Sequence, residues 1–304
     1  MKPAHAMIVA GLCLTLVAPP PALAWNDQGH MATGAIAYDT LKAEHPQAVA
    51  AIVAIMREHS DRALFDQQLD GLTGAARERR MFAIMARWPD DARRGPFDRP
   101  DWHYSLRLVT PWGWFLPITV GKADRAFGDN LALARNPAAP RAQRAVALCW
   151  VLHIVGDMHQ PLHGGHWLSL QYPKSDRSGS LAWVRPYPGA APNTLHDVWD
   201  GIVDRPGSRV QGSEALARDV EAAHPRRMTP RDDREPMTAY RSWVAQSRVM
   251  ARTFVYDGGH LVSATTPEAA PVLAVSYVVR ARSLSEGRIA AAGYRLSDLL
   301  ATVR

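Results

Sequence analysis

Cysteine is almost absent from this sequence, with only Cys13 and Cys149 among 304 residues. Cys13 lies in the apolar run of residues 7–18, which is followed by the small-residue pattern ALA at residues 22–24. This order is typical of a signal peptide cleaved after residue 24, and it predicts export to the periplasm or the medium; the alternative is an uncleaved membrane anchor. The mature chain would keep only Cys149 and no internal disulfide, so bound metal ions could cross-link it instead.

Long apolar stretches are also missing after the first 24 residues. No later segment approaches the roughly twenty uninterrupted apolar residues that cross a bilayer, so no membrane span is expected after cleavage. Lys and Arg number 35 against 29 acids, a mild excess that favours anionic partners without requiring them. No internal repeat or low-complexity linker divides residues 25–304, which predicts one domain.

Helical periodicity accounts for most of that domain. The segments with apolar residues at helical spacing are 28–44, 74–87, 123–135, 141–160, 212–223 and 237–256. Thr266, Pro267 and Glu268 are typical of a helix start and predict a last helix running toward Arg295. Strand signals are weak, and residues 163–193 predict a long loop that could contain a hairpin. The predicted fold class is therefore all-α, a single mostly helical domain.

Histidine and aspartate recur together at helical spacing. HIVGD places His153 and Asp157 four residues apart, and HDVWD repeats the arrangement with His196 and Asp200. Residues four apart lie on one face of a helix, one turn from each other. Between the two pairs, QPLH ends on His163. Imidazole nitrogens and carboxylate oxygens together form a donor set that suits zinc.

Three further candidates lie upstream: His30 in WNDQGH, Asp90 in WPDDAR and His103 in DWHY. Each feature has an ordinary explanation when taken alone. A single His-x-x-x-Asp pair is more often a surface hydrogen bond, Asp90 could cap a turn, and His103 could be a core histidine. Two such pairs in one chain, with a histidine between them and the N-terminal pattern, make a zinc site the better interpretation.

The motifs WNDQGH, WPDDAR, DWHY, HIVGDMHQPLH and NTLHDVWD, with AAGYRLSDLL near the C-terminus, resemble those of the S1/P1 nuclease family. Members of this family are secreted, zinc-dependent nucleases of single-stranded nucleic acid. The resemblance covers residues 25–304, essentially the whole mature chain. It implies the phospholipase C/P1 nuclease-like fold, with a trinuclear zinc cluster at the base of a cleft.

The resemblance also implies ligands for three zinc ions per chain. The first ion would be held by Asp90, His103, His153 and Asp157. The second would share Asp157 and add His30 with the α-amine and carbonyl oxygen of Trp25. The third would be held by His163, His196 and Asp200. Cleavage directly before Trp25 would then be essential, because an extra residue would turn the amine into an amide, which is a poor ligand.

The family likewise implies roles for residues around the metals. Arg93 would contact the scissile phosphate, Asp90 would help to orient the attacking water, and Tyr104 would stack on a base. Outside these roles, Arg93 would be a solvated helix residue and Tyr104 a core aromatic.

Two departures concern base recognition. Leu106 stands where the family commonly has an acid, and Ser178-Gly179-Ser180 stands where it has Gly-Gly-Asn, after an unusually long 164–180 segment. These changes predict weak base preference that depends mainly on stacking.

The resemblance implies a zinc-dependent endonuclease that hydrolyses single-stranded DNA or RNA to 5′-phosphorylated products, with 3′-nucleotidase activity left open. Nucleic acids and nucleotides would be its substrates, and a monomer without a stable protein partner is expected. The first alternative is a zinc-dependent phospholipase C, in which the second helix pair typically ends in Glu rather than in a residue such as Asp200. The second is a zinc-stabilised binding protein, which the presence of Arg93 beside the ligand set disfavours.

Overall fold

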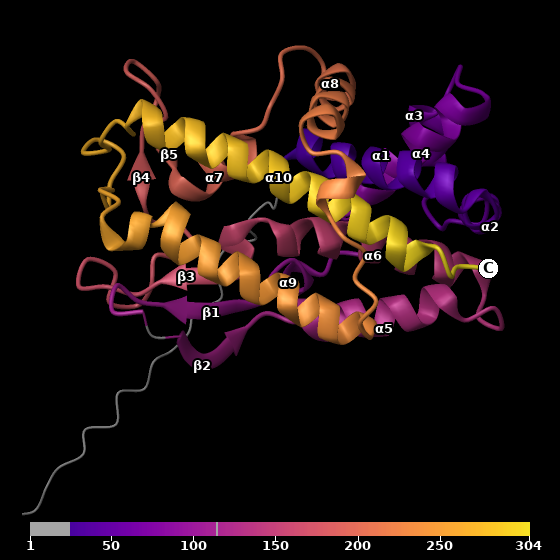
Figure 1. Ribbon diagram of the computed structural model, residues 1–304, viewed down its shortest axis with the longest axis horizontal. Helices are drawn as coiled ribbons and strands as arrows, with labels where there is room; N and C mark the ends of the chain where they lie inside the picture. Colours follow the sequence, from indigo (N-terminus) through magenta and orange to yellow (C-terminus); the bar gives the residue numbers. More distant parts are fainter. Residues whose placement is uncertain (1–24, 114) are drawn as a thin grey trace, which may run out of the picture.

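Helices form most of the computed structural model (Figure 1), which confirms the all-α prediction. The structure describes residues 25–113 and 115–304, and the expected signal segment 1–24 lies outside them. The α-helices are α1 (Asp27–Glu44), α2 (Pro46–Met56), α3 (Arg62–Gln68), α4 (Gly74–Asp91), α5 (Ala123–Arg135), α6 (Arg141–His159), α7 (Leu195–Gly201), α8 (Arg209–Ala223), α9 (Pro236–Met250) and α10 (Val275–Leu300). No helix among the described residues combines the length and hydropathy needed to cross a bilayer.

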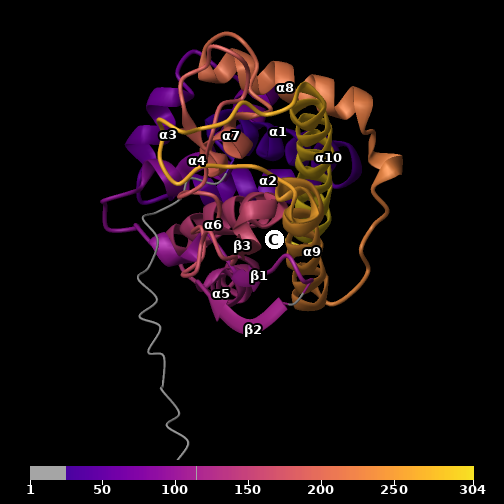
Figure 2. The ribbon, with the colours of Figure 1, turned by 90° about the vertical axis from the view of Figure 1, so that its left-hand side faces the viewer.

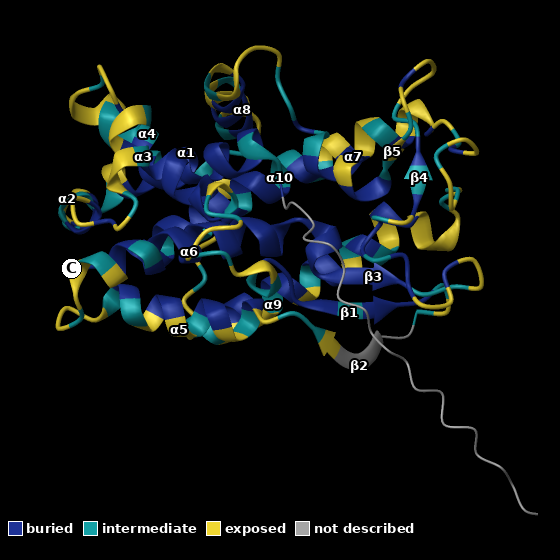
Figure 3. Ribbon diagram, turned by 180° about the vertical axis from the view of Figure 1, so that it is seen from behind, coloured by how far each residue is buried: buried dark blue, intermediate teal, exposed yellow. Residues whose placement is uncertain are grey.

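The helix α6 forms the centre of the molecule. Its sequence is apolar on nearly every side, and a helix of that kind is stable only when other elements surround it. It packs against α5, α4, α10, α2 and α9, while α1 packs against α4, α10 and α8. Figure 3 shows both α6 and α1 buried over most of their length, with exposed residues on the outer helices and loops. Side chains that α6 directs inward are therefore shielded from water.

The C-terminal helices hold the end of α6 in place. Viewed end-on in Figure 2, α9 and α10 run along the same edge of the molecule. The guanidinium of Arg288 on α10 is buried and donates hydrogen bonds to the carbonyls of Met158 and His159 and to the hydroxyl of Ser247 on α9. Burial lowers the pKa of Arg288 to about 9. The negative end of the helix dipole compensates this charge, which fixes the point where α6 ends.

Short strands gather at one end of the molecule, on the left in Figure 1. Strand β1 (Leu106–Val109) pairs antiparallel with β2 (Phe115–Val120) and parallel with β3 (Gly165–Trp167). Strands β4 (Trp183–Val184) and β5 (Asn193–Thr194) form an antiparallel hairpin inside the predicted 163–193 loop. The hairpin matches the expectation, whereas the long-range pairing of β3 with β1 was not predicted.

The last helix begins later than predicted. Residues 266–268 form bends and turns, and α10 starts at Val275 and continues unbroken to Leu300. The preceding segment is held extended beside β4, because the Arg185 amide donates to the Pro271 carbonyl and the Leu273 amide donates to the Arg185 carbonyl. The Thr-Pro-Glu pattern was thus a wrong helix-start signal, since pairing with a distant strand outweighs a local capping preference.

Candidate metal centre

Five predicted ligands converge from four parts of the chain. His153 and Asp157 lie one turn apart on α6, as their spacing predicts, and both are buried. One Asp157 oxygen lies 3.2 Å from Nε2 of His30 on α1. The other lies 3.3 Å from Nδ1 of His103 and 3.3 Å from Nε2 of His153. Asp90, in the last turn of α4, lies 3.8–4.0 Å from the same three imidazoles. We call these five residues the first ligand group.

Helices α1 and α6 approach each other closely at the first ligand group. The rings of His30 and His153 stack with their centroids 4.1 Å apart. A Cβ at Gly156 would lie 2.9 Å from Nδ1 of His30, so the glycine of HIVGD makes room for the imidazole. The HIVGD pattern therefore supplies two ligands and the space for a third.

Several polar atoms of this group are buried without a hydrogen bond. They are both oxygens of Asp157, both ring nitrogens of His30 and Nε2 of His103. Buried polar atoms are nearly always paired, so the two Asp157 oxygens and Nε2 of His30, which faces one of them, need an explanation. A metal ion explains them, because nitrogen and oxygen donors in this combination match those that zinc accepts. The residues present therefore fit the implied metal.

Hydrogen bonds to main-chain carbonyls orient three of the histidines. Nδ1 of His153 lies 2.8 Å from the Ala86 carbonyl, Nδ1 of His163 lies 2.6 Å from that of His103, and Nδ1 of His196 lies 2.7 Å from that of Ser178. A carbonyl only accepts, so each Nδ1 carries the proton and each Nε2 keeps its lone pair. This arrangement is typical of metal-binding histidines, whose second nitrogen is held by an outer partner.

Burial shifts the pKa values in the direction that favours metal binding by the histidines. It lowers the pKa of His30 and His103 well below the usual value and also lowers that of His153, so these rings are neutral and able to coordinate. It raises the pKa of Asp157 well above the usual range and that of Asp200 to about 6. A bound cation would reverse the effect on the two carboxyls, because it stabilises their ionised form.

A second ligand group consists of His163, His196 and Asp200. Pro161 follows the end of α6, and the chain turns through the short 3₁₀ segment Pro161–His163, which brings His163 toward α7. Nε2 of His196 lies 3.2 Å from one Asp200 oxygen, and Gln160 donates to the other at 2.6 Å. The three residues place one donor atom each within 4.8 Å of one another. The same holds for two sets in the first group: His30, His153 and Asp157, and Asp90, His103 and His153.

Trp25 lies directly before α1, the helix that carries His30. Its side chain is fully buried among apolar residues of α1, α8 and α10. The next amide, that of Asn26, donates to the Asp200 carbonyl at 3.2 Å, and the Asn26 side chain caps α1 by accepting from the Gly29 amide. The main chain of Trp25 is thus anchored between α1, which carries His30, and α7, which carries Asp200.

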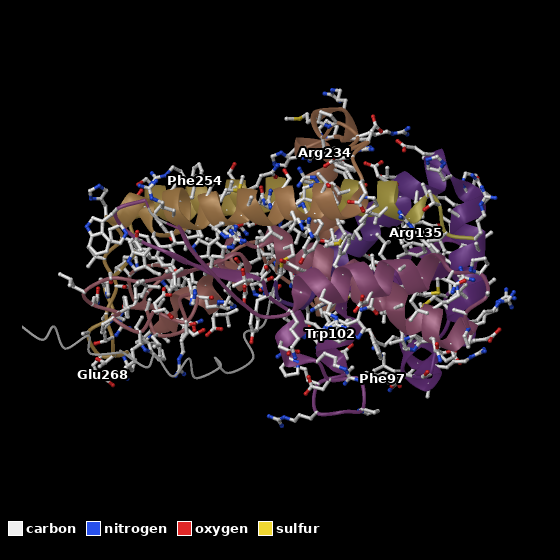
Figure 4. The ribbon with its side chains drawn as sticks, turned by 90° about the horizontal axis from the view of Figure 1, so that it is seen from below. Phe97, Trp102, Arg135, Arg234, Phe254 and Glu268 are labelled. Carbon is white, nitrogen blue, oxygen red and sulfur yellow. The ribbon has the colours of Figure 1, made fainter. Side chains whose placement is uncertain are left out.

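Arg93 lies on the solvent side of the first group. Its Nε and Nη2 donate to one Asp90 oxygen at 3.0 and 2.6 Å. The segment after it is pinned by two aromatic contacts, Phe97 against Trp88 and Trp102 against Trp150, and Figure 4 labels Phe97 and Trp102 there. The guanidinium is therefore held at the edge of the ligand group, where it can also meet an anion.

Tyr104 and Leu106 line a hollow next to the second group. The hollow is shallow, and its other lining residues are Leu162, His163, Arg177, Ser178 and His196. The sequence pointed to the 164–180 segment through its length and to Ser178 through the Ser178-Gly179-Ser180 departure, but not to Arg177. Gln160 was missed as well, because an amide next to a proline carries no recognisable metal-site signal.

The comparison with known families agrees with this geometry. A family model described as S1/P1 Nuclease matches residues 25–304, a range that begins at Trp25 and contains both ligand groups. A search of individually curated proteins returned no match. Members of the family are hydrolases that act on phosphodiester bonds, and they depend in general on zinc. The chain belongs to the S1/P1 nuclease family and is a hydrolase of phosphodiester bonds.

Proposed function

We propose that the mature protein is an exported, zinc-dependent endonuclease that cleaves single-stranded DNA or RNA and leaves 5′-phosphates. It would act as a monomer in the periplasm or the medium and hold about three zinc ions. The observation that carries the proposal is the buried convergence of His30, His103, His153 and Asp157, whose facing atoms include several without hydrogen-bond partners. Zinc bound there would lower the pKa of a water and supply hydroxide near neutral pH.

The chain's own residues bind and orient the substrate. Arg93 would hold the phosphate through charge-assisted hydrogen bonds and stabilise the charge that develops on its oxygens. Asp90, fixed by its two bonds from Arg93, would accept a hydrogen bond from the attacking water and aim it. Tyr104 offers a ring for base stacking, which requires a base that is not paired in a duplex. Together these features support preference for single strands.

The test compares four substrates with protein that starts at Trp25. They are a single-stranded oligonucleotide, its duplex, a 3′-nucleotide and phosphatidylcholine vesicles. We expect turnover of the single strand, at least tenfold less on the duplex, and 5′-phosphate on the products. The 3′-nucleotide measures the additional 3′-nucleotidase activity. Turnover of phosphatidylcholine alone would instead establish a phospholipase C, and turnover of none of the substrates would indicate a binding protein.

A matched pair of variants links this activity to the site. Arg93→Met removes the guanidinium beside Asp90, whereas Arg94→Met removes an exposed neighbouring charge. Loss of a transition-state donor typically lowers kcat about 100- to 1,000-fold, so we expect that effect for Arg93→Met and almost none for Arg94→Met. Equal losses in the two variants would show that only the general positive charge of the surface matters.

A further inference from the structure

The 164–180 segment ends in a strained loop. Ser175, Arg177, Ser178 and Gly179 all have φ between +53° and +84°, a region that residues other than glycine rarely adopt. The three residues other than glycine are strained, and they persist in this conformation only when their surroundings enforce it. The buried carboxylate of Asp176 does so, because it accepts from the Trp167 amide at 2.8 Å and from the Tyr256 hydroxyl at 2.7 Å. The loop is therefore held in one conformation.

This conformation connects the loop to the second ligand group. The Ser178 carbonyl accepts the proton of His196 Nδ1, and a Cβ at Gly179 would lie 3.0 Å from the His196 amide. The side chains of residues 177 and 178 are thereby placed in the hollow beside His163 and His196. A loop that orients a ligand through its main chain thus also lines the surface on which a substrate base would lie.

Two polar groups in the hollow lack partners. The Ser178 hydroxyl is buried and forms no hydrogen bond with any described residue. The guanidinium of Arg177 is half-buried, and within the described ranges 25–113 and 115–304 it forms neither an ion pair nor a side-chain hydrogen bond. Tyr104, Leu106 and Leu162 make the rest of the surface largely apolar. The hollow therefore offers a ligand the guanidinium donors of Arg177 and lacks a carboxylate acceptor.

We propose that Arg177 makes guanine the preferred base at this position, an inference that rests on the proposed function. Guanine exposes two adjacent acceptors, O6 and N7, which match the paired donors of a guanidinium. Cytosine and adenine present exocyclic amino groups that donate, and Leu106 offers them no acceptor. The hollow is narrow, so the base would lie across it, with one face on Tyr104 and its acceptor edge toward Arg177. This proposal replaces the weak preference predicted from Leu106 alone.

Two variants of Arg177 and one control test the proposal. Arg177→Gln keeps most of the length but offers the donor–acceptor pair that suits adenine, and Arg177→Lys keeps the charge without the paired donors. Lys174→Gln is the control, because it removes an exposed charge from the same loop without altering the hollow. The measurements are kcat/KM on single strands that differ only in the base at the cleavage site, and calorimetric binding of GMP, AMP, CMP and UMP.

We expect wild-type protein to favour guanine about tenfold or more in both measurements. Arg177→Gln should lose that preference and shift toward adenine, Arg177→Lys should retain part of it, and Lys174→Gln should retain all of it. Equal kcat/KM and equal affinity of wild type for the four bases would overturn the proposal. So would a decrease of kcat/KM in Arg177→Gln that is the same for all four bases. Tighter binding of GMP without any cleavage would contradict the proposed function and still support the role of Arg177.

Discussion

Replacing the central carboxylate tests whether metal ions account for the buried ligand group. Asp157→Asn preserves the size of the side chain and removes its charge and one ligand oxygen. In metal-free protein the change should be neutral or slightly stabilising, because a buried carboxyl without hydrogen bonds is costly and an amide is less so. In zinc-loaded protein the same change should be strongly destabilising. The opposite signs separate a metal ligand from a structural core residue.

The magnitude follows from ligand linkage. An ion present at a hundredfold excess over its Kd stabilises the folded state by about 2.7 kcal/mol. Asp157 faces His30 with one oxygen and His103 and His153 with the other, so two bound ions would depend on it. Losing both would cost about 5 kcal/mol, or roughly 10 °C in Tm for a chain of this size.

The assay is thermal unfolding in EDTA and in excess zinc, with elemental analysis of each sample. Asp129→Asn is the control, because it changes the same residue type in an exposed ion pair with Arg125 on α5 and should shift either Tm only slightly. Wild type and the control should hold about three zinc ions and gain stability from zinc, whereas Asp157→Asn should hold about one and gain little. An Asp157→Asn protein with full zinc content and the wild-type gain would refute the reasoning.

Two further predictions concern the N-terminus and pH. One extra residue before Trp25 should remove a zinc ion and most turnover, because it turns the amine into an amide; full activity of a chain whose extension is verified by mass spectrometry would contradict the chelate. Burial raises the pKa of Glu221 to about 7, so the stability linked to its protonated form is complete below about pH 4.5 and is lost as the pH rises through 7. The free energy of unfolding of Glu221→Gln should therefore equal that of wild type near pH 4.5 and exceed it by about 1 kcal/mol at pH 8, after allowance for partial exposure. Denaturant unfolding in EDTA measures both free energies. A difference between variant and wild type that stays the same from pH 4.5 to 8 would exclude this.

Local spacing predicted the parts of the site that depend on one helix. His153 with Asp157 and His196 with Asp200 fall on single helix faces, so four residues of sequence were enough to pair them. The groups that hold these ligands could not be predicted in the same way. The Ala86 carbonyl that orients His153 comes from another helix, and the Ser178 carbonyl that orients His196 comes from a loop. Every residue has a main-chain carbonyl, so the amino-acid sequence does not mark the one that orients a ligand.

The wrong helix start has the same physical origin. A helix start at Thr266 is locally favourable, but residues 271–273 pair with Arg185, which follows β4 and lies almost ninety residues earlier in the chain. The weak base preference predicted from Leu106 stays a prediction, and our proposal for Arg177 rests on a residue that the fold brings to the same hollow from a separate loop. Such contacts between distant segments become visible only after the chain has folded.

The way the ligands are anchored explains how the metal site and the base site can change separately. The loop orients His196 through the Ser178 carbonyl, and the loop conformation depends on Asp176 and Gly179. Any side chain at positions 177 and 178 that tolerates a positive φ leaves this support intact. Substitutions there can therefore alter the surface offered to a base while the ligand geometry stays fixed. Because main-chain groups orient the ligands, the side chains that face a substrate can be exchanged without moving the metal site.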